Sequence, residues 1–438
     1  MEVSIATEQE AKLIRALGVP SLAANIINTT IGAGIFVLPA VAAKQLGAAS
    51  PLAFLVCAIA MCLVVTSFAM AGSRVSLTGG LYAYVEVALG RYVGFLAGVL
   101  FCVTAVLSVS GVVNVFAGSV GILIPALATG IARFFLILFV FGSLALINIR
   151  GVRAGARAVD IVTLAKIAPL IIFVVAGIFF IRPSAMAWPG WPGSKALGES
   201  VIVVIFAFAG IEVALVPSGE VKNPARTVPR AIYIALAVTT LLYVMIQLVG
   251  QGVLGNDLAN YPDAPLAEAA AQFLGNFGRS LMLAGAAMSA FGFVTSDILS
   301  SPRILFAFGR DGILPGWFAN THSRSHAPHV AIIIYSAIAF VCALSSTFQQ
   351  LAVLANVAVL LLYFLCCLAT LKLAGQNIRG DGQPFHFPGA NLIPVLAIIV
   401  IIWILAHATI REFAVNAACL AVASVLFFVR RLFTRKTR

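Results

Sequence analysis

Long apolar runs without charge dominate this sequence and restrict the folds that the chain can adopt. Many windows of more than about 18 residues contain no charged side chain, which is typical of helices that cross a membrane. Of the 438 residues, 62% are hydrophobic and 10% are charged, whereas soluble domains carry about 25% charged residues. The runs are continuous rather than alternating, which argues against a membrane β-barrel. The sequence therefore predicts an all-α membrane protein.

About twelve membrane spans account for these runs if each span takes roughly 20 residues. The predicted spans cover residues 20–43, 51–72, 92–123, 132–148, 159–181, 199–217, 230–253, 279–301, 329–347, 351–373, 391–410 and 414–429. Residues 73–91, between the second and third spans, indicate a short interfacial helix, and residues 255–278 indicate an external loop with a helix.

The positive charges are unevenly distributed between alternate loops. With the N-terminus placed inside, basic residues such as Arg150 and Lys222 gather in the inner loops and in the C-terminal residues 430–438, and fewer lie in the outer loops. This positive-inside pattern predicts a multi-pass protein of the plasma (bacterial inner) membrane with both termini in the cytoplasm. It also accounts for the net charge of +12 without nucleic acid as a partner. The polar, acidic residues 1–15 do not fit a cleavable signal peptide.

Glycine interrupts two of the apolar runs at corresponding places. The first interruption is Ile31–Phe36, and the second is Phe206–Glu212. A helix that unwinds in hydrocarbon exposes N–H and C=O groups, which is very costly unless these groups line a cavity or bind a ligand. A pair of interrupted spans in the two halves of a membrane chain indicates the substrate site of a transporter. The alternative is that the glycines only allow close packing of helices.

The interrupted spans divide the predicted helices into two halves of five. Because five is odd, the halves have opposite orientations in the membrane, as in the inverted repeats of many secondary transporters. We predict a single transmembrane domain over residues 1–438, with residues 19–182 and 199–374 as the two repeats and residues 391–430 as two additional helices.

The two breaks offer complementary main-chain groups. N–H groups at the start of a half-helix near Ile31–Phe36 suit a carboxylate, and free carbonyls at the second break suit an ammonium, so together they predict a site for the main-chain end of an amino acid. Three ionisable residues, Lys166, Glu212 and Asp297, lie deep in predicted spans, where charged side chains are usually functional. The alternative is a buried structural ion pair or, for Lys166, a side chain that reaches the interface.

No metal, cofactor or enzymatic chemistry is predicted. The seven cysteines all lie in apolar runs without other metal ligands, and His322, His326 and His329 are interpreted as parts of a solvated inner loop. The sequence has no glycine-rich phosphate loop that ends in Lys-Ser or Lys-Thr. Scattered ionisable groups do not form the site of an intramembrane enzyme, which needs clustered carboxylates or a nucleophile with its base, and no ring of charges indicates a channel.

Several segments together resemble the amino acid–polyamine–organocation permeases. They are the first break, the block 206–212, the sequence EVKNPARTVPRA at 220–231 and the sequence SPRILFAFGRDGILP at 301–315, and Gly79–Tyr82 fits as well. The similarity extends over nearly the whole chain. It implies the leucine-transporter fold, with a five-plus-five inverted repeat, two added helices, and helices 1 and 6 unwound in the middle of the membrane.

The resemblance also implies roles for individual residues when the chain is compared with the arginine–agmatine antiporters of the family. The substrate carboxylate is expected at N–H groups near Ala33 and Gly34, and the substrate ammonium at the carbonyls of Thr30, Phe206 and Ala209. The residues predicted to bind substrate are Thr30, Ile31, Gly32, Ala33, Gly34, Phe206, Ala209, Gly210 and Asp297.

Three positions depart from the pattern of these antiporters. Phe206 replaces a tryptophan and is expected to form an aromatic wall, Ala33 replaces a serine, and Asp297 replaces a second pocket aromatic. These differences argue against arginine–agmatine exchange itself. If Asp297 faces the substrate, a cationic amino acid or a polyamine is favoured. If it pairs with a helix end or with Lys166, neutral apolar amino acids are favoured.

Residues 160–169 resemble the fifth span of sodium-independent members, in which a lysine ammonium occupies the place of a bound sodium ion. A fixed cation repels a mobile one at close range, so Lys166 is predicted to replace sodium and to help couple transport to protons or to set exchange. Glu212 is a second candidate for proton coupling. The overall prediction is a secondary active transporter of amino acids that works by alternating access, with an amino acid or polyamine, protons and membrane lipid as partners and the oligomeric state left open.

Overall fold

The computed structural model describes residues 18–75, 81–151, 156–188, 190–211, 221, 224–323, 325–376, 385 and 389–435. Every regular element in these ranges is a helix. Seven helices are long and apolar enough, by length and composition, to cross a membrane, and three further apolar helices are shorter. The prediction of an all-α membrane protein is confirmed, and the count of twelve spans stays a prediction.

The helices follow the predicted spans closely. In chain order the α-helices are α2 (Val19–Thr30), α3 (Leu38–Leu46), α4 (Pro51–Gly72), α5 (Leu81–Leu89), α6 (Arg91–Leu123), α7 (Gly130–Ile149), α8 (Ala156–Gly177), α9 (Ser194–Val204), α10 (Pro224–Leu254), α11 (Pro265–Ser300), α12 (Pro302–Arg310), α13 (His329–Ser345), α14 (Phe348–Gly375), α15 (Leu392–Leu405) and α16 (Ile410–Arg435). The helix predicted within residues 73–91 is α5, and its position at the membrane interface stays a prediction. The predicted helix in residues 255–278 is the first part of α11, which bends at Gly275, where φ is 60°.

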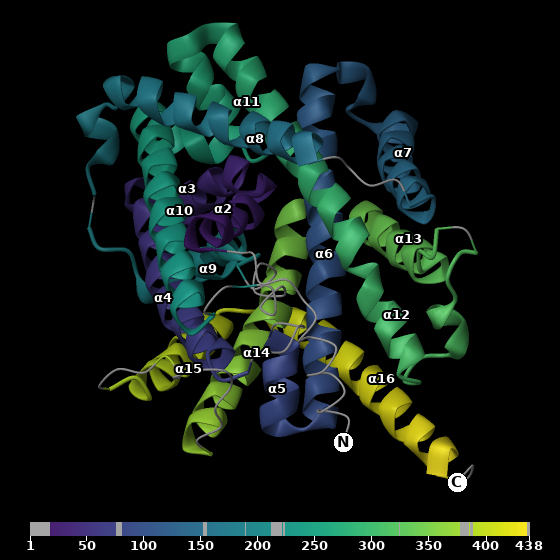
Figure 1. Cartoon of the computed structure of the whole chain (residues 1–438). Helices are drawn as coiled ribbons and strands as arrows, with labels where there is room; N and C mark the ends of the chain where they lie inside the picture. Colours follow the sequence, from purple (N-terminus) through teal and green to yellow (C-terminus); the bar gives the residue numbers. More distant parts are fainter. Residues whose placement is uncertain are drawn as a thin grey trace.

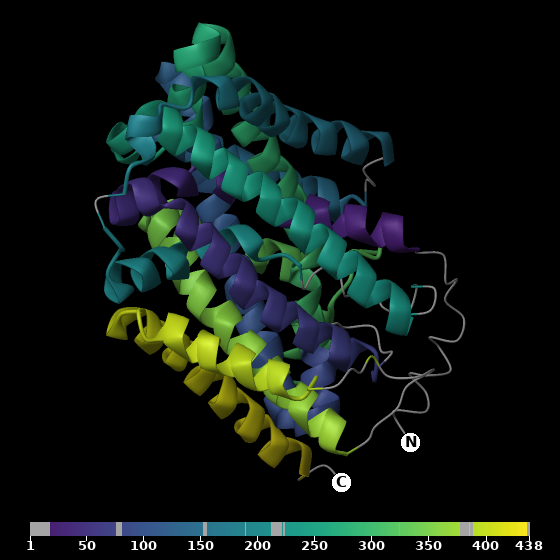
Figure 2. The ribbon, with the colours of Figure 1, turned by 90° about the vertical axis from the view of Figure 1, so that its left-hand side faces the viewer.

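The long helices α6 and α14 lie against each other in the middle of the molecule (Figure 1). On one side α11 packs on α6 and α8, and on the other side α10 packs on α2 and α4. The C-terminal helices α15 and α16 lie along one outer edge (Figure 2). In the apolar stretch of α16 only 11% of the residues are buried in the protein, as expected for a helix whose apolar surface meets lipid.

One asparagine links three of these helices through polar contacts. The amide nitrogen of Asn114, on α6, donates to the carbonyls of Ala343 at 2.9 Å and Ser346 at 3.1 Å. Its amide oxygen accepts a hydrogen bond of 3.1 Å from Arg133 on α7. The last carbonyls of a helix have no partner within the helix, so Asn114 satisfies the end of α13 and joins it to α6 and α7.

We expect Asn114→Leu to destabilise the protein by about 2 kcal/mol, because buried carbonyls and a guanidinium lose their partner. The matched control is Asn148→Leu on α7, whose amide nitrogen donates to Leu144 of its own helix. The apparent melting temperature of the detergent-purified variants measures the effect. An equal loss in both variants would contradict the linking role of Asn114.

Candidate functional site

The first predicted interruption is a break in the backbone of the helix. Helix α2 ends at Thr30, and Ile31 (φ −73°, ψ 89°) and Gly32 (φ −105°, ψ −167°) are not helical. One 3-10 turn, η1 (Ala33–Phe36), follows before α3 begins at Leu38. The local geometry agrees with the glycine motif, because the chain leaves the helical conformation at Ile31.

The second interruption also lies where the sequence predicts it. Helix α9 ends at Val204, the 3-10 turn η6 (Ile205–Phe208) follows, and Ala209 is extended. At Gly210, φ is 109°, a conformation that favours glycine strongly. Glu212, predicted to couple protons, lies outside the described residues.

The two breaks touch each other, although they are far apart in the sequence. A Cβ atom on Gly210 would lie 2.9 Å from the carbonyl oxygen of Thr29, at the end of α2. A Cβ atom on Gly34 would lie 3.1 Å from Cδ1 of the Phe206 ring. Glycine at both positions therefore permits a close approach between the first break and the second.

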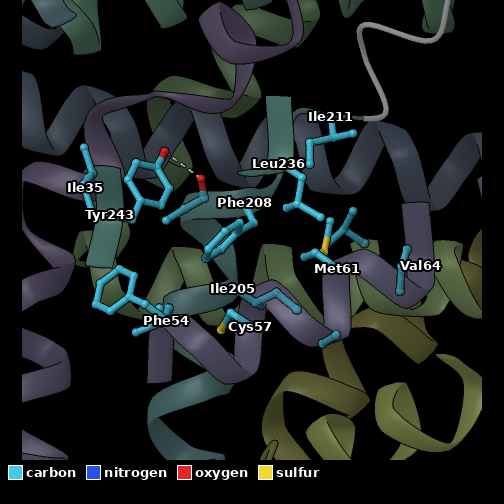
Figure 3. Close-up of a cluster of buried hydrophobic side chains, with 14 of the residues drawn as sticks. Ile35, Phe54, Cys57, Met61, Val64, Ile205, Phe208, Ile211, Leu236 and Tyr243 are labelled. Atoms are coloured by element: carbon cyan, nitrogen blue, oxygen red, sulfur yellow. Dashed lines mark hydrogen bonds between the residues drawn. The ribbon is translucent and has the colours of Figure 1, made fainter. Parts of the chain in front are cut away.

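A tyrosine that the sequence analysis did not single out bridges the two breaks. The hydroxyl of Tyr243, on α10, donates to the carbonyls of Thr30 and Ala207, each at 3.0 Å. Its ring is fully buried and lies among Ile35, Phe54 and Phe208 (Figure 3). A single O–H proton is thus shared between carbonyls that belong to the two broken segments.

Lys166, on α8, reaches the same end of α2. Its Nζ atom donates to the carbonyl oxygen of Asn28 at 2.5 Å, and the residue is only 8% exposed. A cation stabilises the C-terminal end of a helix, where the last carbonyls carry partial negative charge. Among the described residues, no carboxylate forms an ion pair with this ammonium.

Phe206 and Asp297 have different surroundings. The Phe206 ring meets Phe348 edge to face, with centroids 5.4 Å apart, and covers Gly34. The Asp297 carboxylate accepts hydrogen bonds from Ser301 at 2.7 Å and from Tyr335 of α13 at 2.5 Å. Both carboxylate oxygens are therefore held by neighbouring hydroxyl groups, and in the described ranges no hydrogen bond joins Asp297 to either break.

Most of the predicted binding residues of the first break are buried. Thr30, Ile31 and Ala33 are at most 3% exposed, and Gly34 is buried. Gly32 of this break is partly exposed, as are Phe206, Ala209 and Gly210 of the second break. In this conformation most of the first break is therefore covered by protein, while several residues of the second break are partly exposed.

The sequence profile of the amino acid permease family matches residues 17–429. The chain belongs to this family. It is 26% identical to the branched-chain amino acid permease BcaP of Bacillus subtilis (strain 168), over 98% of this chain and 95% of that protein. It is 28% identical to the methylthioribose transporter of the same organism, over 100% of this chain and 97% of that protein.

A third relative, from a plant, is named for yet another kind of substrate. The chain is 28% identical to the vacuolar cationic amino acid transporter 2 of Arabidopsis thaliana, over 85% of this chain and 61% of that protein. The resemblance inferred from the sequence motifs is thereby confirmed. The family and these relatives are permeases and transporters rather than enzymes, so this permease is a membrane protein of that kind.

We expect Gly210→Ala to lower uptake of a radiolabelled amino acid mixture into proteoliposomes by about tenfold or more. Alanine in this backbone conformation carries strain of about 1–3 kcal/mol, and a free-energy difference of about 1.4 kcal/mol changes a rate tenfold. The added methyl would meet the Thr29 carbonyl, and φ is 109°. The matched control is Gly142→Ala on α7, where a Cβ has no neighbour within 4 Å. Near-normal uptake by properly folded Gly210→Ala protein would contradict the importance of this contact.

Proposed function

We propose that this permease is a secondary active transporter that moves amino acids across the plasma membrane by alternating access. The observation that carries the proposal is the contact between two broken helical segments from separate parts of the chain. Irregular main chain at membrane depth is tolerated where it is buried in protein or lines a cavity. Paired interrupted helices mark the binding site in many secondary transporters.

The proposed ligand is the zwitterionic end of an amino acid. Its carboxylate accepts hydrogen bonds from N–H groups in residues 31–34, at the start of the η1 turn, where the backbone carries partial positive charge. Its ammonium donates to the carbonyls of Thr30, Phe206 and Ala209. Both charges of one small molecule are then neutralised by main chain from the two breaks.

The proposed membrane arrangement has twelve spans in one domain. The seven long helices and three shorter apolar helices, with each interrupted segment counted as one span, account for that number. We propose residues 19–182 and 199–374 as inverted repeats of the leucine-transporter fold, residues 391–430 as the two additional helices, and both termini in the cytoplasm.

Transport is proposed to be independent of sodium and either coupled to protons or run as exchange. The support is the Lys166 ammonium, which donates to the Asn28 carbonyl at the end of α2. A fixed positive charge repels a sodium ion that approaches the same oxygen atoms. Glu212 stays a second candidate for carrying the proton.

A neutral amino acid is the substrate class that the surroundings of Asp297 support. A carboxylate held by Tyr335 and Ser301 gives up two hydrogen bonds if it turns toward a cationic substrate, while Phe206 offers an apolar wall. Exchange of cationic amino acids or polyamines is the second candidate, and similarity to a cationic amino acid transporter supports it.

A thermal-shift screen of the purified protein against all amino acids and common polyamines tests the proposed function. A ligand that binds only the folded protein raises the apparent melting temperature by mass action. Candidates from the screen are then tested for saturable uptake into proteoliposomes. If no amino acid shifts the melting temperature and none is taken up, the proposal fails.

We expect replacement of sodium by choline to leave proteoliposome uptake unchanged within about twofold, because the site of a coupled cation is filled by a fixed charge. Lys166→Ala should remove stimulation of uptake by an imposed proton gradient or, in an exchanger, reduce exchange. Lys44→Ala, at an exposed position, is the control for loss of a lysine. Loss of wild-type uptake in choline would refute the role assigned to Lys166.

We expect Asp297→Asn to keep the substrate preference of the wild type, because an amide of the same shape replaces a carboxylate that contacts Tyr335 and Ser301 rather than substrate. Competition by a panel of neutral and cationic amino acids and polyamines measures the preference. Asp257→Asn, in the η9 turn (Gly255–Asn260), controls for the change in net charge. Selective loss of cationic competitors would support the cationic alternative instead.

A further inference from the structure

Buried polar side chains recur at every fourth position along α10. Thr239, Tyr243, Gln247 and Gln251 follow this spacing and are at most 1% exposed. Residues four apart lie on the same face of a helix, and this helix packs on α2, α3 and α4 (Figure 2). A buried polar group in an apolar span is costly unless it is hydrogen-bonded, so each of these side chains calls for a partner.

The two glutamines meet Ser50, which precedes α4. Gln247 donates from Nε2 to the Ser50 hydroxyl at 2.7 Å, and the Ser50 hydroxyl donates to Oε1 of Gln251 at 3.3 Å. A longer contact of 3.4 Å joins Gln247 to the Pro39 carbonyl of α3. A polar cluster without solvent exposure therefore lies where α3 and α4 meet α10.

This cluster leaves one acceptor and one donor without a protein partner among the described residues. They are Oε1 of Gln247 and Nε2 of Gln251. The hydroxyl oxygens of Thr239 and Thr30 are also unpaired within the same ranges. One water molecule can accept from the amide nitrogen and donate to the amide oxygen, which is how buried waters are usually held.

We propose that the polar side chains of α10 hold bound water and form a track along which protons move between the α3–α4 end of the helix and the two breaks. The inference rests on the proposed proton-coupled transport. In the proposed orientation the α3–α4 end faces the outside. The track starts at Gln251, passes Ser50 and Gln247, and ends at Tyr243, whose hydroxyl bridges the breaks.

Proton movement along the track leaves its waters and hydroxyls unchanged overall. Each water or hydroxyl accepts one proton on one side and releases another to its neighbour, while the glutamine amides only orient the water. From the Tyr243 hydroxyl a further bound water passes the proton to Lys166, which is a neutral amine only at this step. Lys166 takes one proton and becomes the ammonium that donates to Asn28. Asn28 and Thr30, the partners of Lys166 and Tyr243, lie on the same turn of α2.

Several helices pack against α8, and the charged side chains on them are the candidates for contact with Lys166. In the described ranges they are Arg226 and Arg230 on α10 and Glu268, Arg279 and Asp297 on α11. Glu268 and Arg279 form an ion pair of 2.8 Å with each other, and the Asp297 carboxylate is held by Ser301 and Tyr335.

Gln247→Leu separates proton movement from substrate binding. We expect uptake driven by a proton gradient to fall by about tenfold, while exchange of labelled for unlabelled amino acid at equal pH stays within about twofold, since exchange needs no net proton transfer. The matched control is Asn416→Leu on α16, which also removes a buried amide with an unpaired oxygen. A parallel fall of both activities, or no change in either, overturns the proposal.

A second measurement needs neither a variant nor transport. Hydroxyl radicals produced from water by X-rays oxidise side chains that contact bound water. We expect Tyr243 to be oxidised several-fold faster than Tyr363, although both are at most 1% exposed. Equally slow oxidation of the two overturns the track, whatever the transport assays give.

The outcomes also distinguish this proposal from the proposed function. If wild-type protein exchanges amino acids but does not respond to a proton gradient, proton conduction is refuted and amino acid transport stands. If wild-type protein transports no amino acid, the proposed function fails, and the oxidation of Tyr243 alone decides whether α10 holds water.

Discussion

Main-chain groups that leave a helix inside an apolar protein need new partners, and this requirement organises the centre of the structure. Each break frees carbonyl and N–H groups that hydrocarbon cannot satisfy. The two breaks pack against each other, which shields part of this main chain from lipid. Gly210 lies against the end of α2, and Gly34 lies beneath Phe206. A side chain at Gly210 would meet the Thr29 carbonyl, and one at Gly34 would press on the Phe206 ring, so glycine favours the close approach at both positions.

Side chains from two other helices supply the remaining partners. Lys166 of α8 brings a positive charge to the Asn28 carbonyl, and Tyr243 of α10 brings one shared proton to Thr30 and Ala207. These hydrogen bonds tie α8 and α10 to the end of α2 and to the second break. The geometry of the breaks is therefore coupled to helices that lie outside them, as the proposed alternating access requires.

The sequence predicted the helices and the breaks because both follow from local rules. Uninterrupted apolar runs set the helices, and glycine marks where the winding stops, so α6 and α10 and the changes at Ile31 and Gly210 agree with the predictions. Partners distant in sequence have no such local signal. Tyr243 looks like an ordinary apolar-core aromatic until its hydroxyl is placed between two carbonyls, and Asp297 gives no hint that Tyr335, on another helix, holds it.

The sequence of α10 nonetheless contains a pattern that points to Tyr243. A single polar residue in an apolar span has many explanations, whereas Thr239, Tyr243, Gln247 and Gln251 repeat with the period of a helix face. Such a repeat predicts a buried polar stripe before any partner is known. One member of the stripe, Tyr243, contacts both breaks, so buried polar groups of α10 and the main-chain groups freed by unwinding two helices lie in the same part of the molecule. Water bound as proposed along α10 would serve several of these polar groups at once.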